Sequence, residues 1–105
     1  MCVEANITEL QVALAEGARL VDVREEEEYV LGHVAGSELV PMRTVRGRVE
    51  DLRGGQPLYV ICEVGARSAV VADFLATQGI SAINVAGGMH DWRRSGYPVE
   101  TGVPR

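Results

Sequence analysis

A single cysteine stands where an apolar run, 57–62, gives way to a helical pattern, and the residues after it are suited to nucleophilic chemistry. Cys62 is followed by Gly65, Arg67 and Ser68. The glycine can adopt a backbone conformation closed to other residues, which lets successive N–H groups converge. A thiolate there would also face a helix N-terminus, so its pKa would fall below that of a free cysteine. The alternative is an inert core cysteine, which position alone favours, and other segments of the chain decide between the two.

Short apolar runs alternate with helical patterns along the chain, and this alternation predicts how Cys62 is placed. Four runs predict strands, at 19–23, 37–41, 57–62 and 82–85. The intervening segments are too long for hairpins, so the strands are expected to run parallel with helices on both faces, in an α/β fold. In open parallel sheets ligands bind beyond the carboxyl ends of the strands, which is where Cys62 falls.

The segments between these runs carry helical signals. Asn6 and Glu9 have the spacing of a capping box, which predicts a helix start. Four consecutive glutamates at 25–28 are expected to form a solvated face near a helix N-terminus rather than a metal or acid site. Helices are therefore predicted at 7–16, at 42–52 as an amphipathic helix, at 67–78 and, in a short form, within 86–99, and the segment 24–32 is predicted to be a short acidic helix or a turn.

Composition argues against several classes of function. The chain has 105 residues, a net charge of −5, ten arginines and no lysine. A net acidic chain is a poor nucleic-acid binder, and the missing lysine excludes Schiff-base chemistry and a P-loop. Two cysteines and two histidines form no close ligand pair, so no metal site is expected. No apolar run reaches the ~20 residues of a membrane span, and a soluble cytoplasmic protein is expected.

Three parts of the sequence resemble, in order, the motifs of the rhodanese family. The first comprises DVR at 22–24, EY at 28–29 and GHVAG at 32–36. The second, 59–75, resembles the family's strand, loop and helix around its active cysteine. The third, 86–99, resembles the family's closing signature of two glycines, a tryptophan and a Pro-Val pair. Because three separate motifs occur in the right order, the resemblance is specific.

This resemblance covers about residues 5–100 and implies one rhodanese-like domain over 1–105. Its fold would be a three-layer α/β/α arrangement around a small, mainly parallel sheet of four to five strands. Its activity would be that of a thiosulfate sulfurtransferase, in which Cys62 takes sulfane sulfur from thiosulfate, becomes a persulfide and passes the sulfur to cyanide or a thiol. No metal or organic cofactor is implied. Expected partners are a small sulfur-containing anion and a thiol acceptor, with a persulfide-donating or thioredoxin-like protein as a further candidate.

The resemblance also implies roles around Cys62, which would be the nucleophile. The substrate-binding loop would comprise five residues: Glu63, Val64, Gly65, Ala66 and Arg67. Its N–H groups would stabilise the thiolate and the persulfide. Arg67 would bring a fixed positive charge that can pair with an anionic donor. Glu63 is expected to face solvent or a partner protein, and Ser68 either hydrogen-bonds within the loop or caps the helix.

Other residues are expected to support the site or to lie outside it. Asp22 and Arg24 end the first predicted strand at the same edge as Cys62 and would buttress the loop. His33 belongs to the Gly-His motif and is expected to be structural rather than catalytic. Cys2 is expected to be a free surface cysteine at a mobile N-terminus.

Three alternatives stay open. A cysteine phosphatase or arsenate reductase on the same scaffold would space nucleophile and arginine as Cys-x5-Arg, whereas Cys62 and Arg67 are one residue closer, which suits a single sulfur atom better. A non-catalytic module is disfavoured because such domains usually lose the cysteine. A carrier that receives persulfide from a protein donor, and is slow with thiosulfate, is favoured by the acidic composition and by Glu63.

Overall fold

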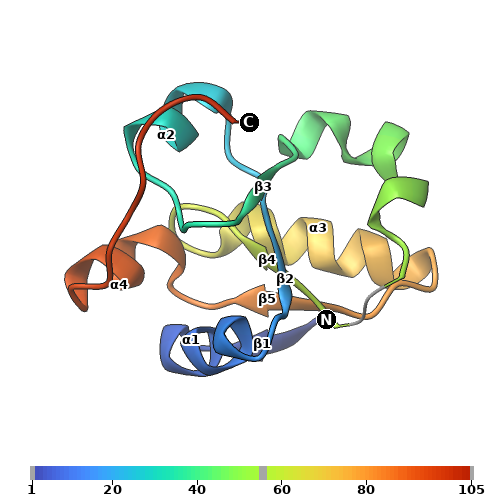
Figure 1. Ribbon diagram of the computed structural model, residues 1–105. Helices are drawn as coiled ribbons and strands as arrows, with labels where there is room; N and C mark the ends of the chain where they lie inside the picture. Colours follow the sequence, from blue (N-terminus) through green and yellow to red (C-terminus); the bar gives the residue numbers. More distant parts are fainter. Residues whose placement is uncertain (1, 55–56, 105) are drawn as a thin grey trace.

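The computed structural model describes residues 2–54 and 57–104, and within them a five-stranded parallel sheet forms the centre (Figure 1). The strands are β1 (Val3–Ala5), β2 (Arg19–Asp22), β3 (Glu38–Leu39), β4 (Leu58–Ile61) and β5 (Ala82–Val85). They lie in the order β1-β5-β4-β2-β3, and every neighbouring pair is parallel. The predicted α/β class and the mainly parallel sheet of four to five strands are confirmed.

Strand β1 is absent from the sequence-based prediction. Val3 and Glu4 are exposed and only Ala5 is buried, so these residues form no apolar run. The strand forms because its backbone pairs with β5, with Val3 opposite Ile83 and Ala5 opposite Val85. Its partner lies near the other end of the chain, and a local sequence pattern does not contain that information.

Four α-helices and two 3₁₀-helices are found among the described residues. They are α1 (Ile7–Ala15), α2 (Glu26–Leu31), η1 (Met42–Arg48), η2 (Glu50–Leu52), α3 (Ala66–Thr77) and α4 (Gly88–Arg94). The predicted capping box is confirmed, since the Glu9 N–H donates to Asn6 Oδ1 and the Asn6 N–H to Glu9 Oε1, both at 2.8 Å. Apart from the segment 42–52, the predicted helices match α1, α2, α3 and α4 in type and position.

The amphipathic helix predicted over 42–52 is helical, but it is not one continuous helix. The segment forms the two 3₁₀-helices η1 and η2. Apolar residues spaced by three suit both helix types. The first turn follows Pro41, whose carbonyl accepts the N–H and the hydroxyl of Thr44, each at 2.7 Å. Gly47 then lowers the α-helical propensity of the middle of the segment, so the tighter i→i+3 pattern continues.

Helices cover both faces of the sheet, which confirms the three-layer arrangement (Figure 1). On one face α3 packs against β4 and β5, and its Val71 and Leu75 belong to a hydrophobic cluster shared with η1 and η2. On the other face α1 contacts α4, and Leu10, Met89 and Trp92 form part of a second cluster. The alternation of side chains along each strand separates the two clusters.

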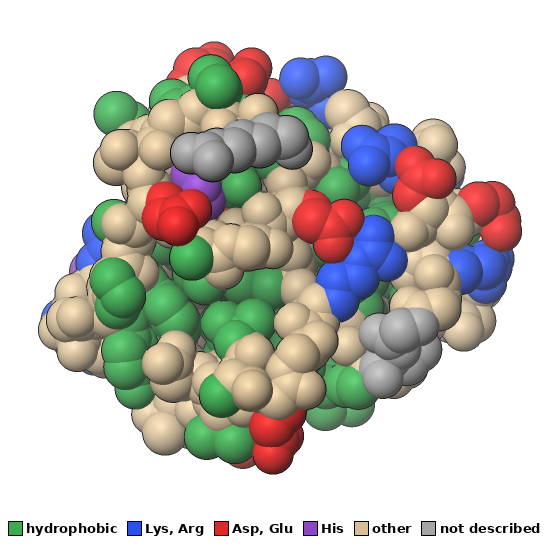
Figure 2. Space-filling model, in the orientation of Figure 1, with side chains coloured by type: hydrophobic (Ala, Val, Ile, Leu, Met, Phe, Trp, Pro, Cys, Tyr) green, Lys and Arg blue, Asp and Glu red, His purple; other side chains and the backbone are tan. Residues whose placement is uncertain are grey.

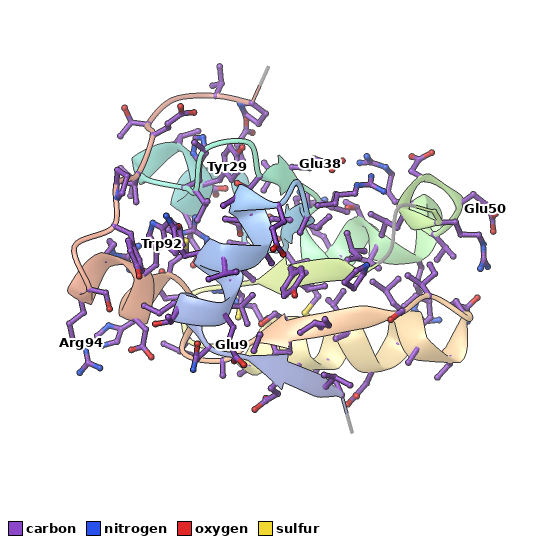
Figure 3. The ribbon with its side chains drawn as sticks, turned by 60° about the horizontal axis from the view of Figure 1, so that its bottom comes forward. Glu9, Tyr29, Glu38, Glu50, Trp92 and Arg94 are labelled. Atoms are coloured by element: carbon purple, nitrogen blue, oxygen red, sulfur yellow. The ribbon has the colours of Figure 1, made fainter. Side chains whose placement is uncertain are left out.

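Apart from the buried Asp22 and Arg24, most charged side chains lie on the outside of the molecule, with both signs interspersed. Glu50 and Arg94 extend away from the surface, whereas Tyr29 and Trp92 point inward (Figure 3). On the face shown in Figure 2, basic side chains lie beside acidic ones. None of the helices in residues 2–54 and 57–104 is long and apolar enough to cross a membrane.

The carboxyl ends of β2, β4 and β5 meet at one edge of the sheet because the strands are parallel. Asp22 lies opposite Ile61 in the sheet, and the Val23 N–H donates to the Ile61 carbonyl at 3.0 Å. This register brings the residues that follow β2 and β4, Arg24 and Cys62, to the same edge.

Candidate active site

Cys62 lies directly after β4, and the loop that follows encloses its sulfur. The residue is only 1% exposed. The Gly65 N–H donates to Sγ at 3.2 Å and the Ser68 N–H at 3.4 Å. The Ser68 hydroxyl lies 3.2 Å from the same atom. One sulfur atom is therefore surrounded by hydrogen-bond donors, an arrangement that stabilises negative charge on it.

Gly65 makes the tight turn around the sulfur possible. Its φ of 106° lies in the left-handed region that favours glycine. Gly65 is also the N-cap of α3, so the first N–H groups of the helix point back toward Cys62. On either side of it, Val64 and Ala66 are exposed at the tip of the loop. The loop thus presents its backbone to the sulfur and its side chains to the surface.

The start of α4 holds the loop from its outer side. The Met89 N–H donates to the Cys62 carbonyl and the His90 N–H to the Glu63 carbonyl, both at 2.9 Å. These bonds tie the backbone at the start of the loop to α4. Gly88 permits the close approach, because an added Cβ would lie 2.4 Å from the Cys62 carbonyl oxygen. The glycines of the closing motif therefore position the loop.

Asn84 is a site residue that sequence reasoning missed. It lies in β5, is 1% exposed, and its Nδ2 donates to the Gly65 carbonyl at 3.3 Å and to Glu4 Oε2 at 3.0 Å. The bond to Gly65 ties the N-cap of α3 to the sheet. A polar residue within the apolar strand Ala82–Val85 was the available signal, because a buried amide needs hydrogen-bond partners.

The pKa of Cys62 is lowered from its ordinary value. Burial acts in the opposite direction and is the largest single influence, since removal from water disfavours the thiolate. The Ser68 hydroxyl and the N–H groups of Ser68, Gly65 and Val64 outweigh it by donating to the sulfur. Two of these contacts come from Ser68, which lies outside the predicted loop of residues 63–67.

Ser68 hydrogen-bonds within the loop, the first of its two predicted alternatives. The helix cap is Gly65, and Ser68 lies inside α3, fully buried. Its hydroxyl is therefore directed at Cys62 rather than at the end of the helix. The capping alternative is wrong, because the left-handed glycine already begins the helix.

Arg67 is bound to a carboxylate, Glu28 of α2. Its Nη1 and Nη2 donate to the two oxygens of Glu28 at 2.8 and 2.9 Å. These hydrogen bonds lower the pKa of Glu28 to about 2, and they raise the pKa of Arg67. The charge of Arg67 is thus compensated within the chain, and its pairing with an anionic donor stays a prediction. The expectation that Glu28 belongs to a solvated face is corrected. The signal that could have identified Glu28 is its place in the EY motif of 28–29.

Arg24 and Asp22 form a buried ion pair beside the loop. Arg24 is 1% exposed, and its guanidinium contacts both oxygens of Asp22 at 2.8 to 3.1 Å. It also donates to the Gly32 carbonyl at 2.8 Å, which ties the end of α2 to β2. Of the predicted supporting residues, Asp22 therefore lies beside β4, the strand that ends just before Cys62, and Arg24 lies beside Glu63 of the loop.

Glu63 is held by ion pairs within the chain. Its carboxylate lies 3.5 Å from Arg24 Nη1 and is paired with Arg93 of α4. The expectation that Glu63 faces open solvent or a partner is thus corrected. Two arginines lie within reach from different elements, and pairing with them is available without any partner. A neighbouring pocket of about 280 Å³ is lined by Arg24, Glu28, Leu31, Gly32, Glu63 and Arg93.

His33 has the surroundings expected of a structural residue, whereas Cys2 is more buried than expected. His33 is buried, its Nδ1 lies 2.8 Å from the Tyr29 carbonyl, and its ring stacks on Tyr29 at 3.6 Å between centroids. This packing agrees with a structural role. Cys2 is a free cysteine, as expected, but it is half-buried and packs against the hydrophobic core instead of lying fully on the surface. Burial, followed by the charge of Asp73, raises the pKa of Cys2.

The fold and the loop around Cys62 define a known class of protein. Residues 6–95 match the family described as the rhodanese-like domain. The chain therefore belongs to the rhodanese-like family, and the resemblance found in the sequence is confirmed.

Individual relatives agree with this assignment. "Thiosulfate sulfurtransferase GlpE" of Pseudomonas fluorescens is 34% identical over 92 residues, which cover 87% of this chain and 84% of that protein. "Putative sulfur carrier protein YrkF" of Bacillus subtilis is 38% identical over 78 residues, or 73% of this chain, and the chain spans only 42% of that protein's length. The crystal structure of a rhodanese-related protein from Thermoplasma volcanium matches with a TM-score of 0.89 and 31% identity, covering 95% of this chain and 99% of that one.

Proposed function

We propose that this protein is a sulfurtransferase that carries sulfane sulfur as a persulfide on Cys62. The observation that supports the proposal most directly is the enclosed sulfur of Cys62, which accepts hydrogen bonds from Gly65 and Ser68. Donors arranged in advance around one atom favour its anionic form, whether thiolate or persulfide. The activity in the name of the GlpE relative points the same way.

The reaction consists of two transfers through a covalent intermediate. The Cys62 thiolate attacks the outer sulfur of a donor such as thiosulfate, a new S–S bond forms, and sulfite leaves with the electron pair of the broken S–S bond. An acceptor, cyanide or a thiolate, then attacks the outer sulfur of the persulfide and releases the Cys62 thiolate. Two transfers through a covalent intermediate predict ping-pong kinetics. No oxidant enters either step.

The neighbouring residues take supporting roles in this proposal. The backbone of the loop from Glu63 to Arg67, together with Ser68, binds the transferred sulfur. Asp22 holds the buried guanidinium of Arg24, which in turn lies 3.5 Å from the Glu63 carboxylate of the loop. A reducing compartment, the cytoplasm, suits a protein whose reactive thiol must stay reduced between turnovers.

The test is the intact mass of the protein after incubation with thiosulfate and removal of the excess donor. We expect a gain of one sulfur atom, which cyanide then discharges. Cys62→Ser should lose this gain, whereas Cys2→Ser, the matched control at the other cysteine, should keep it. Incubation with a persulfide donor is run in parallel. A wild-type protein that gains no sulfur from either donor would contradict the proposal.

A further inference from the structure

The charged side chains around Cys62 point to the class of sulfur donor. Resting on the proposed function, we infer that the site selects a thiol persulfide, R–S–SH, over the free thiosulfate dianion, and that Glu28 and Glu63 are the residues that set this preference. Three features of the site support this inference: its charge balance, the polarity of its rim and the chemistry of the transfer.

Every arginine described beside the loop is paired with a carboxylate. The three pairs are Asp22–Arg24 at 2.8 Å, Glu28–Arg67 at 2.8 Å and Glu63–Arg93. Glu63 also lies 3.5 Å from Arg24. Three positive charges thus meet three negative ones, and this cluster carries no net positive charge before Cys62 ionises.

A dianion meets an electrostatic cost at such a site. Thiosulfate has to approach a thiolate, and repulsion between like charges is strong where water is excluded. An uncompensated arginine would offset that repulsion, but the two nitrogens of Arg67 that face Glu28 already donate to both of its oxygens. Thiosulfate would have to displace a bidentate carboxylate to use them. A protonated persulfide on an uncharged thiol does not meet this cost.

The rim of the site offers apolar surface to the thiol-bearing group. Leu31 lines the pocket of about 280 Å³ and is 81% exposed, and Val64 at the tip of the loop is 61% exposed. Exposed aliphatic side chains give an inorganic dianion nothing to bind, whereas they can cover the carbon chain of a thiol. Glu28 and Glu63 line the same pocket as Leu31, so a ligand bound there would meet both carboxylates and an apolar side chain.

Transfer of sulfur from a persulfide to Cys62 needs no other reactant. The Cys62 thiolate attacks the outer sulfur of R–S–SH, and a bond forms between Cys62 Sγ and that sulfur. The S–S bond of the donor breaks, R–S⁻ leaves with the electron pair, and the proton stays on the transferred sulfur. The thiolate R–S⁻ leaves as a monoanion, whereas thiosulfate would release the sulfite dianion into the same paired cluster.

The experiment compares two donors in the wild type and in three variants, of which one is a control. Thiosulfate and the persulfide of 2-mercaptoethanol, whose thiol carries no charged group, are used to load Cys62 in wild type, Glu28→Gln and Glu63→Gln. The quantity measured is the ratio of kcat/KM for thiosulfate to kcat/KM for the persulfide. Glu27→Gln is the matched control, since Glu27 is the exposed neighbour of Glu28 on the same helix and its substitution changes the net charge equally.

We expect the wild type to prefer the persulfide. The ratio should rise at least about tenfold in Glu28→Gln and in Glu63→Gln, because each frees an arginine beside Cys62, and it should stay at the wild-type value in Glu27→Gln. A wild type that prefers thiosulfate, or a ratio that moves equally in all three variants, would overturn the inference while leaving persulfide formation on Cys62 intact. Failure of both donors to load Cys62 would instead overturn the proposed function.

Discussion

Two opposing effects act on the thiol of Cys62. Removal from water raises its pKa, while donors from the loop and from Ser68 lower it, and the donors prevail. They prevail because a charged acceptor gains more from each hydrogen bond than a neutral one does. The thiol is therefore shielded from bulk solvent and still inclined to ionise, which is the combination that a buried nucleophile needs.

Substitution of Ser68 tests this balance at a single atom. We expect Ser68→Ala to raise the pKa of Cys62, because the Ser68 hydroxyl is the strongest of the hydrogen bonds that lower it. Loss of one hydrogen bond to a charged group costs about 1.5 kcal/mol, so alkylation at neutral pH should slow about tenfold. The measurement is the rate of alkylation by iodoacetamide against pH, in a Cys2→Ser background.

The control for this experiment is Ser81→Ala, at an exposed serine before β5. It should leave the pH profile of alkylation at its wild-type position. If Ser68→Ala also left the profile unmoved, the hydroxyl would not be stabilising the thiolate.

At the scale of elements, the site depends on how α4 begins. The N–H groups of Met89 and His90 bind the carbonyls of Cys62 and Glu63, so α4 orients a loop that belongs to a different strand. Gly88 stands at this contact with a φ of 53°. The glycine of the closing motif therefore lets the backbone of α4 approach the backbone of Cys62 and Glu63.

Gly88→Ala is expected to disrupt that contact. Its Cβ would lie 2.4 Å from the Cys62 carbonyl oxygen and 2.7 Å from that of Glu63, so the loop has to shift. We expect the free energy of unfolding to fall by about 1–3 kcal/mol and the loading of Cys62 with sulfur to slow markedly. Urea unfolding and the intact-mass assay measure the two effects.

Gly47→Ala provides the matched control, because an added Cβ at Gly47 meets nothing within 4 Å and Gly47 is not among the positive-φ glycines. It should leave stability and sulfur loading close to wild type. A Gly88→Ala protein that behaved like Gly47→Ala would show that the loop does not depend on α4.

At the scale of the whole molecule, the site joins segments that are distant in the sequence. The parallel sheet brings the ends of β2, β4 and β5 to one edge, and ion pairs then connect the surrounding helices. Glu28 of α2 binds Arg67 of α3, and Glu63 binds Arg93 of α4. These links contribute to the stability of the fold as well as to the charge of the site.

The Glu28–Arg67 pair predicts a pH-dependent stability. Hydrogen bonds from Arg67 lower the pKa of Glu28 from 4.5 to about 2. Because the pKa is lower in the folded state, the pair stabilises the protein above about pH 4.5, and this contribution is lost as the pH falls toward about 2. Both side chains are more than one-third exposed, so we expect about 1 kcal/mol rather than the full linkage value.

Urea unfolding of wild type and Glu28→Gln measures this contribution. The difference in unfolding free energy should be largest near neutral pH and shrink as the pH is lowered through 4.5. Glu27→Gln, on the exposed side of α2, should show no such trend. A difference for Glu28→Gln that stayed constant with pH would mean that the ion pair does not account for it.

Local patterns were sufficient for most elements and for the centre of the site. The strands around Cys62, the capping box at Asn6 and the glycine of the loop follow from residue type and short-range spacing, because strand burial, helix starts and left-handed turns are decided within a few residues. The helix type at 42–52 was not predicted, since its apolar spacing suits two kinds of helix. The same applies to β1, whose pairing is long-range.

The sequence by itself determined the family, the α/β class and the cysteine at the end of a strand, because these are carried by motifs and by periodicity along the chain. Only the tertiary structure decided which charges pair. It placed Glu28 on Arg67, Glu63 between two arginines, and the amide of Asn84 on the Gly65 carbonyl. Such contacts join residues that are distant in sequence, and the energy of a charge depends on what lies within a few ångströms of it, which spacing along the chain does not specify.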